Sequence, residues 1–351
     1  MTLNVKGYAA FAAKEDLVPH HFVRRDPRDN DVVIEILYSG VCHSDIHNAF
    51  NDWGGAKYPM VPGHEIIGRI THVGKAVTKF RVGDYAGVGC MVDSCQHCKP
   101  CEQGLEQYCE EGSTLTYNDI DRHDQMPTYG GYSDKIVVTE KFVIKIPETL
   151  DLKGAAPLLC AGITTWSPLR HWKVGPGSQV AVVGLGGLGH MAIKLAKALG
   201  AEVTLFSRSP NKEADARRLG AAHIVISTDE KQMQGVYNQF DLIIDTVPYV
   251  HDLKPYIPTL ALNGTLVLVG YLGDLDPVLN STPLILGRKS VAGSVIGGIA
   301  ETQEMIDFCA EHQITSDIEL ITIQDINVAL QRMLKSDVKY RFVIDIASLN
   351  A

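Results

Sequence analysis

The segment at residues 180–189 constrains the fold of this chain most strongly. Four apolar residues at 180–183 precede Gly-Leu-Gly-Gly-Leu-Gly, and a helical pattern then continues over 188–199 up to Gly200. A strand, a G-x-G-x-x-G turn and a helix in this order let backbone N–H groups and the positive helix end approach a pyrophosphate. A glycine-rich turn without a ligand is the alternative, but the flanking elements favour dinucleotide binding. The expected cradle consists of Gly184, Gly186, Gly187, Leu188 and Gly189.

The rest of the chain predicts an α/β protein with two domains. From residue 179, apolar strands alternate with helical segments, which is typical of a doubly wound parallel sheet. Before about residue 153 the chain instead reads as many short strands separated by glycine and proline turns, and the strand-like segment 340–345 is interpreted as a return to that first domain. We therefore expect a first domain at 1–152, a nucleotide-binding domain at 153–293 and a returning segment at 294–351. The candidate strands of the second domain are 180–183, 202–206, 224–226, 242–245, 265–269 and 290–293.

Composition narrows the class of protein. A formal net charge of −9 and a pI near 5.8 argue against nucleic acid or an anionic membrane as the main partner. No apolar run approaches the ~18 residues that span a bilayer. The first residues read as a strand rather than as a secretion signal, so a cytoplasmic location is expected. Eight cysteines are present, and in a reducing compartment their clustering indicates metal binding rather than disulfides.

Four of the cysteines form a closed set in a lobe at about 90–112. Cys95, Cys98, Cys101 and Cys109 have the spacing C-x2-C-x2-C-x7-C. Thiols so spaced can complete a tetrahedral all-sulfur shell around zinc, which leaves no open position and indicates a structural site. Disulfides between residues three apart would be strained. An iron–sulfur cluster stays open as an alternative, since four thiolates also hold those.

The residues after the second strand of the nucleotide-binding domain indicate the cofactor. An NAD enzyme usually places Asp or Glu here to bind the ribose hydroxyls. This chain has Ser207, Arg208 and Ser209, followed by Lys212, whereas Glu202 lies at the start of the strand. Two hydroxyls and two cations suit a 2′-phosphate, so we expect NADP(H). The alternative is that Arg208 and Lys212 are solvated surface charges.

A second set of metal-binding residue types is dispersed along the chain. Cys42, His64 and Cys160 would make a three-ligand shell with an open fourth position, the arrangement of catalytic zinc. Taken singly, each has a simpler interpretation as a packing residue, a satisfied core histidine or a small buried hydrophobe. Composition and spacing alone do not join the three.

The motifs around these residues resemble the zinc-dependent medium-chain dehydrogenase/reductase family over essentially the whole chain. The resemblance rests on Gly-His-Glu-x-x-Gly at 63–68, the four-cysteine lobe, the glycine loop and Arg-Phe-Val-Ile-Asp at 341–345. Gly-Val-Cys-His-Ser-Asp and Leu-Leu-Cys-Ala-Gly-Ile-Thr-Thr are similar to the cinnamyl alcohol dehydrogenase branch, especially its bacterial broad-substrate NADP-dependent aldehyde reductases. The resemblance implies a GroES-like, partly open β-barrel catalytic domain, a Rossmann domain and an active site in the cleft between them.

The resemblance also assigns roles to residues. It implies catalytic zinc on Cys42, His64 and Cys160, with Glu65 able to take the fourth position and Asp45 orienting His64. Two zinc ions per chain are expected, one catalytic and one structural. A proton relay would run from the Ser44 hydroxyl through the nicotinamide ribose to His47, although a local turn or cap is the simpler role for Ser44. The remaining implied contacts are His43, Thr164, Thr246, Val269 and Arg341 for the cofactor, and Trp53 and Cys90 for the substrate pocket, where Trp53 is otherwise an ordinary core aromatic.

The expected activity is reversible hydride transfer between NADP(H) and aldehydes or primary alcohols of broad aromatic and aliphatic range, mainly as aldehyde reduction. A homodimer is expected through the edge of the Rossmann sheet near 284–293. One rival is an NAD-dependent polyol or secondary alcohol dehydrogenase, which often has Glu in place of Cys160 and an acid near position 207. The other is a non-catalytic NADPH-binding protein, which would be expected to lack zinc ligands or the relay.

Overall fold

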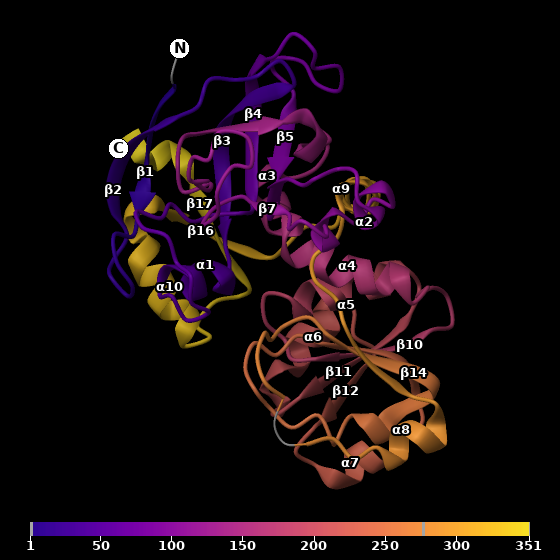
Figure 1. Cartoon of the computed structure of the whole chain (residues 1–351). Helices are drawn as coiled ribbons and strands as arrows, with labels where there is room; N and C mark the ends of the chain where they lie inside the picture. The colour runs from indigo at the N-terminus through magenta and orange to yellow at the C-terminus, as the bar shows by residue number, and fades with distance from the viewer. Residues whose placement is uncertain (1–2, 276–277, 351) are drawn as a thin grey trace. The chain divides into compact units, whose positions relative to one another are not determined.

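The computed structural model describes residues 3–275 and 278–350, and it divides into two compact units (Figure 1). The first unit contains Met1–Cys160 and Gly297–Ala351, and the second contains Ala161–Ile296. The first unit includes α3 (Leu152–Ala155) and the 3-10 turn η3 (Ala156–Leu159), because these pack against its strands. The sequence analysis instead expected the division at 152/153, whereas the compact units meet at Cys160 and Ala161.

The first unit is built on a seven-stranded sheet. Its order is β16-β17-β3-β4-β5-β9, with β8 also pairing with β3. The long central strand β3 (Asp31–Val41) is buried over most of its length, since Val32, Ile34 and Ile36 lie in the core. The other strands are β4 (Ile66–Val73), β5 (Tyr85–Val88), β8 (Lys135–Thr139), β9 (Ile144–Lys145), β16 (Ile318–Thr322) and β17 (Arg341–Asp345).

Smaller elements complete the first unit. Two antiparallel pairs lie outside the main sheet: β1 (Leu3–Ala9) with β2 (Val18–Arg24), and β6 (Met91–Asp93) with β7 (Thr114–Leu115). Besides α3, the helices of this unit are α1 (His43–Ala49), α2 (Lys99–Glu102), α9 (Ile299–Glu311) and α10 (Ile326–Leu334).

The C-terminal segment belongs to the first unit. Strand β17 pairs antiparallel with β3, and Phe342 lies opposite Val41. The buried apolar residues of β17 continue the core of the sheet, which favours this pairing. The register places Arg341 beside the end of β3, where Cys42 follows.

The second unit is a six-stranded parallel sheet of order β12-β11-β10-β13-β14-β15. Because β10 lies between β11 and β13, the strand order reverses at β10, which defines the topological switch point of a Rossmann fold. The strands are β10 (Gln179–Val183), β11 (Glu202–Ser207), β12 (His223–Ile226), β13 (Phe240–Asp245), β14 (Leu260–Leu268) and β15 (Ser290–Gly293). The helices are α4 (Ala161–His171), α5 (Gly189–Ala198), α6 (Glu213–Leu219), α7 (Glu230–Gln234) and α8 (Thr282–Gly287).

Buried apolar side chains hold the second unit together. The ring centroids of Phe240 and Tyr256 lie 5.4 and 5.3 Å from the ring centroid of Phe206. All three rings belong to one core cluster. Helix α5 ends where the sequence indicated, because Gly200 takes φ +92° just after it.

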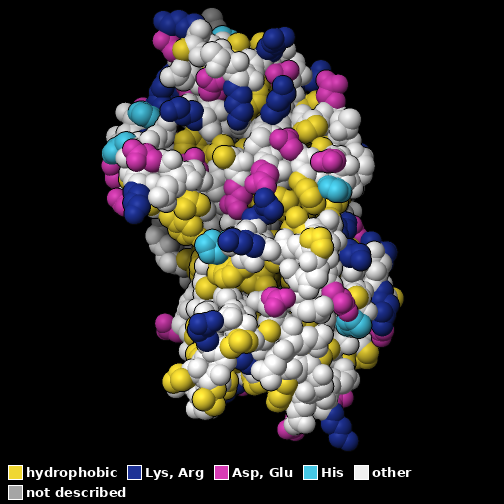
Figure 2. Space-filling view, turned by 90° about the vertical axis from the view of Figure 1, so that its right-hand side faces the viewer, with side chains coloured by type: hydrophobic (Ala, Val, Ile, Leu, Met, Phe, Trp, Pro, Cys, Tyr) yellow, Lys and Arg dark blue, Asp and Glu magenta, His cyan; other side chains and the backbone are white. Residues whose placement is uncertain are grey.

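None of the helices among the described residues is long and apolar enough to cross a bilayer. Acidic and basic side chains are interspersed on the face shown in Figure 2.

Candidate functional site

The dispersed metal-binding residues converge in the first unit. Cys42 caps the start of α1, His64 and Glu65 immediately precede β4, and Cys160 immediately precedes α4. One ligand atom from each of the four lies within 4.8 Å of the others, and all four residues are buried. The Sγ atoms of Cys42 and Cys160 are 4.0 Å apart. The fold thus joins three donors that sequence spacing could not connect.

This donor set fits a zinc ion. Two thiolates on one tetrahedral zinc, each about 2.3 Å from the metal, lie about 3.8 Å apart, close to the observed sulfur separation. Glu65 is fully buried, its Oε1 contacts Arg341, and its Oε2 has no hydrogen-bond partner. A buried carboxylate oxygen without a partner is costly unless a cation or proton satisfies it. Cys42, His64, Cys160 and the Glu65 carboxylate would hold the metal.

A buried carboxylate orients the histidine of this set. Asp45 accepts a hydrogen bond from His64 Nδ1 at 3.1 Å, which leaves Nε2 as the metal-binding nitrogen. It also accepts from the backbone N–H groups of Cys42 and Gly63, at 2.8 and 3.1 Å, and from the Tyr132 hydroxyl at 3.1 Å. These donors compensate the burial of the Asp45 charge. Such outer contacts fix the orientation of a ligating imidazole.

The electrostatics around Cys42 favour the thiolate that zinc requires. A hydrogen bond from Cys160 lowers the pKa of Cys42 well below its usual value, with further lowering by Arg341 and His64 and opposition from burial. Burial lowers the pKa of His64, but Asp45, Cys90 and Cys42 outweigh it and raise that pKa. Arg341, for which the resemblance implies a contact with the cofactor at its pyrophosphate, lies in the structure against Glu65 and beside the thiols of Cys42 and Cys160. A contact with a pyrophosphate stays a prediction.

The two expected relay residues lie on one short helix beside the metal set. Ser44 Oγ is 3.7 Å from Cys42 Sγ, and His47 lies about one turn further along α1. His47 Nδ1 donates to Asp52 Oδ2 at 2.9 Å, and its ring faces Trp53 with centroids 4.9 Å apart. Sequence reasoning missed Asp52, because a carboxylate five residues away in a turn carries no distinctive spacing. A histidine held this way can pass protons.

Substitution of the relay residues gives a first expected result. His47→Gln should slow turnover by roughly 10–100-fold, because a positioned proton carrier supplies about 10²–10⁴ and water can replace part of it. Ser44→Ala should be slower still, since it removes the group nearest the reacting oxygen. Steady-state rates across pH, with His223→Gln as a control for an exposed histidine paired with a carboxylate, measure both. Near-normal rates in both variants would remove the relay.

Three further side chains lie around the metal set. Trp53 is 45% exposed, so it is not the core aromatic considered as its alternative. Cys90 lies next to Cys160, and their hydrogen bond lowers the pKa of Cys90. Tyr117, which sequence reasoning did not single out, stacks on the His64 ring with centroids 5.8 Å apart. Whether Trp53 and Cys90 contact substrate stays a prediction. His43, the first residue of α1, has its pKa lowered by burial.

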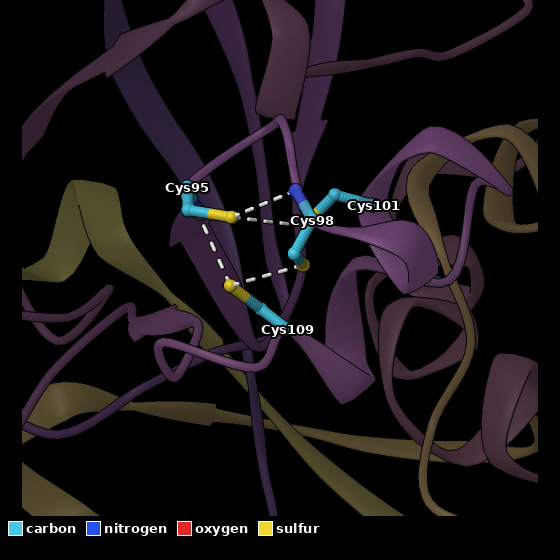
Figure 3. Close-up of side chains that lie close together, drawn as sticks. All are labelled: Cys95, Cys98, Cys101 and Cys109. Carbon is cyan, nitrogen blue, oxygen red and sulfur yellow. Dashed lines mark hydrogen bonds between the residues drawn. The ribbon is translucent and has the colours of Figure 1, made fainter.

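The four-cysteine lobe is a second metal-binding set, shown in Figure 3. Cys95 Sγ is 3.9 Å from Cys101 Sγ, and Cys98 Sγ is 4.0 Å from Cys109 Sγ. Backbone N–H groups of Cys98, Cys95 and Glu110 donate to three of the sulfurs at 3.3–3.4 Å. The donation from Glu110 lowers the pKa of Cys98 to about 7. All eight cysteines are free thiols, so the lobe fits zinc and not a disulfide pair.

The glycine loop forms an open cradle at the end of β10. Gly184 takes φ +89°, and a Cβ on Gly189 would lie 2.1 Å from the Gly184 carbonyl oxygen, so both positions require glycine. A Cβ on Gly186 would meet nothing within 4 Å, which leaves open space in front of the α5 N-terminus. This is the room a pyrophosphate needs. Among the other residues assigned to the cofactor, Thr246 Oγ1 donates to the Val183 carbonyl at 2.7 Å, Val269 follows β14, and Thr164 is buried in α4.

The ribose end of this cradle is basic. Ser207 Oγ donates to the Ser209 carbonyl at 2.7 Å, and Lys212 Nζ donates to the Leu185 carbonyl at 3.1 Å, inside the glycine loop. Arg208 is exposed beside them. Glu202 lies at the opposite end of β11, where it accepts from His223 at 2.7 Å. It is therefore too distant to act as a ribose acceptor, as the sequence indicated.

Comparison with known proteins identifies the family. Residues 28–148 match the alcohol dehydrogenase GroES-like domain, and residues 187–311 match the zinc-binding dehydrogenase domain. The chain is 53% identical to NADP-dependent alcohol dehydrogenase C 1 of Mycolicibacterium smegmatis over 99% of each chain. It is 51% identical to the aldehyde reductase YahK of Escherichia coli over 98% of each. A cinnamyl alcohol dehydrogenase (CAD) of Helicobacter pylori, solved with NADP(H), superposes with a TM-score of 0.92 at 47% identity over 99% of each chain.

These matches agree with a fold and a donor set that define a zinc-dependent, nucleotide-using oxidoreductase. The chain belongs to the zinc-dependent alcohol dehydrogenases of the medium-chain dehydrogenase/reductase family. The predicted combination of a GroES-like domain and a Rossmann domain is confirmed. The family match also favours zinc over the iron–sulfur alternative.

Proposed function

We propose that this protein reduces aldehydes to primary alcohols with NADPH, using zinc held by Cys42, His64 and Cys160, and that a second zinc in the four-cysteine lobe is structural. The observation that carries the proposal is the buried set of two thiols, one imidazole and one carboxylate, with ligand atoms within 4.8 Å of one another. The relatives of this protein include an NADP-dependent alcohol dehydrogenase and an aldehyde reductase.

The chemistry follows from the groups at the site. When bound, zinc supplies a Lewis acid for the carbonyl oxygen, and NADPH supplies the hydride for the carbonyl carbon. The Ser44 hydroxyl gives a proton to that oxygen, and His47 restores it. Asp52 accepts the hydrogen bond from His47 Nδ1 and so orients the imidazole ring. The reverse sequence oxidises a primary alcohol.

Cofactor choice rests on Ser207, Arg208, Ser209 and Lys212. The two cations suit a phosphate, and no carboxylate at the end of β11 would repel it. Because cellular NADP(H) is mostly reduced, we assign aldehyde reduction as the main direction. The thiols of both metal sets require a reducing compartment, which favours the cytoplasm. A non-catalytic NADPH-binding role is disfavoured, because every expected zinc ligand and relay residue is present.

An aldehyde panel tests this function. Zinc-loaded protein should oxidise NADPH when given aromatic or aliphatic aldehydes, and should act more weakly with NAD on a polyol such as mannitol. Dialysis against a chelator should abolish the aldehyde-dependent rate, and added zinc should restore it. A protein that oxidises polyols with NAD more efficiently than it reduces any aldehyde would support the polyol dehydrogenase alternative instead.

We also propose that the protein is a homodimer formed through the edge of its Rossmann sheet. Strand β15 is the last in the sheet order, and among the described residues it pairs only with β14. Large apolar side chains are exposed in β14, in α8 and in the segment between them: Leu262 is 69% exposed, Val278 83%, Ile285 75% and Leu286 81%. An unpaired strand edge beside exposed apolar side chains favours association with another chain. A two-fold axis at this edge would bury the β15 edge of both copies at once.

Disruption of this surface gives an expected result for the dimer. Ile285→Asp should convert the protein to a monomer, because a carboxylate would be buried without a partner at the interface. Light scattering on a sizing column measures the mass. Val328→Asp is the matched control, since Val328 is 61% exposed on α10 of the first unit. A wild-type monomer would contradict the dimer.

A further inference from the structure

A chain of contacts in the second unit links a buried carboxylate to the exposed cation at the ribose end of the cradle. Asp245, the last residue of β13, is 1% exposed and accepts a hydrogen bond from His251 Nε2 at 2.8 Å. His251 Nδ1 donates to the Tyr249 carbonyl at 3.0 Å. Both ring nitrogens of His251 thus donate to oxygen atoms: one contact ties the segment 246–251 to the end of β13, and the other fixes the backbone of the segment itself at Tyr249.

This anchored segment presents Tyr249 to Arg208. Arg208 Nη2 donates to the Tyr249 hydroxyl at 2.9 Å, and the guanidinium carbon lies 5.8 Å from the centroid of the same ring. A hydrogen bond and a cation–π contact to one side chain restrict a long arginine that would otherwise sample many rotamers. Among the described residues, Arg208 has no carboxylate partner, and its remaining guanidinium N–H groups are free for an anion.

Two cations, Arg208 and Lys212, gather at this point. Lys212 is tied to the glycine loop through the Leu185 carbonyl. Burial and then the charge of Arg208 lower the pKa of Lys212, against a smaller opposing effect from Asp215. Like charges held together disfavour the ligand-free state, and a bound anion would relieve that repulsion. The end of β11 and the segment after β13 flank β10 and its loop, so both cations lie where the ribose of a dinucleotide would be.

We propose that Tyr249 is a positioning residue that holds Arg208 for the 2′-phosphate of NADP(H), with the Asp245–His251 pair fixing Tyr249. The proposal rests on the NADP(H) choice proposed above and names a specificity determinant for it. Tyr249 acts through Arg208, so its effect should be confined to ligands that carry the 2′-phosphate. Holding the guanidinium in place before binding reduces the ordering cost of the charged contact.

Titration calorimetry with two nicotinamide-free probes tests the proposal. Adenosine 2′,5′-bisphosphate carries the 2′-phosphate, and adenosine 5′-monophosphate differs from it only in lacking that group. Tyr249→Ala should weaken the first by about three- to tenfold, as expected for losing one exposed cation–π contact and one hydrogen bond, and should leave the second within about twofold. Tyr249→Phe, which keeps the ring, should fall between wild type and Tyr249→Ala. Tyr237→Ala is the matched control, because Tyr237 is 48% exposed in the same unit.

A second arm uses the Arg208→Ala background. There, Tyr249→Ala should cause no further loss of adenosine 2′,5′-bisphosphate binding, because the group that it positions is gone. An equal loss with both probes, or an undiminished loss in the Arg208→Ala background, would overturn the positioning role. If the wild-type protein bound both probes equally, the NADP(H) assignment itself would be wrong. That failure would appear in the wild-type protein, whereas failure of the positioning role would appear only in the Tyr249 variants.

Discussion

Cys160→Ala should give a folded protein that contains one zinc per chain instead of two and has lost turnover by about 10³-fold or more. The thiol lies 4.0 Å from that of Cys42 and supplies one of the three strong donors. Loss of the ligand removes Lewis acid assistance worth several kcal/mol, and each 1.36 kcal/mol is tenfold in rate. Elemental analysis and initial rates with an aldehyde measure the two effects.

Cys309→Ala is the matched control for that substitution. Cys309 is fully buried in α9, outside both metal sets, and its Sγ lies 3.7 Å from Met305 Sδ. Both variants remove one buried sulfur, so any general packing cost appears in each. Turnover should survive in Cys309→Ala. Two zinc ions and near-normal turnover in Cys160→Ala would show that the catalytic site lies elsewhere.

Cys95→Ser should mainly damage folding. The lobe from β6 through α2 to β7 contains only short helices and strands, and its four cysteine sulfurs lie within 4.8 Å of one another. A closed metal site contributes its binding free energy to folding. The variant should lose the structural zinc, unfold at a lower temperature and become sensitive to proteolysis within the lobe. The activity that remains per folded molecule should fall less than in Cys160→Ala.

His97→Ala distinguishes the four-cysteine set from an overlapping one. Cys95, His97 and Glu111 also lie close enough to hold a metal ion, but His97 and Glu111 are exposed and pair with each other at 2.8 Å. If the four cysteines hold the ion, His97→Ala should retain both zinc ions and almost unchanged stability. Loss of one zinc in His97→Ala would assign the ion to the mixed set.

The sequence predicted most of the Rossmann sheet because its strands are short apolar runs between turn residues. Strand β10 covers 179–183 where 180–183 was expected, whereas β14 begins at Leu260, five residues before the predicted start. The early residues of β14 include Asn263 and Gly264, which predict a turn. Asn263 takes φ +65°, and the register with β13 shifts between Leu260 and Thr265, so the local preference persists as an irregularity within a longer strand.

The same distinction between local sequence signals and distant contacts applies to the functional site. Cysteines with fixed spacing, and motifs with a family resemblance, pointed to donor residues that the structure brings together. Tyr132, Asp52 and Tyr249 carried no such signal, because their roles depend on partners 87, 5 and 41 residues away and on loops that set their direction. Arg341 shows the limit of the resemblance, since its ion pair with Glu65 is visible only when β17 is placed against β3.

The ratio of kcat/KM for NADPH to that for NADH, with one aldehyde as substrate, is the most direct test of the proposed NADPH-dependent aldehyde reduction. Two charge-assisted contacts from Arg208 and Lys212, each contributing roughly 1.5–3 kcal/mol, predict a preference for NADPH of at least about a hundredfold after solvent screening. Arg208→Ala should reduce this ratio by weakening NADPH alone. Equal use of both cofactors by the wild-type protein, or no reduction of any aldehyde with NADPH, would contradict the account.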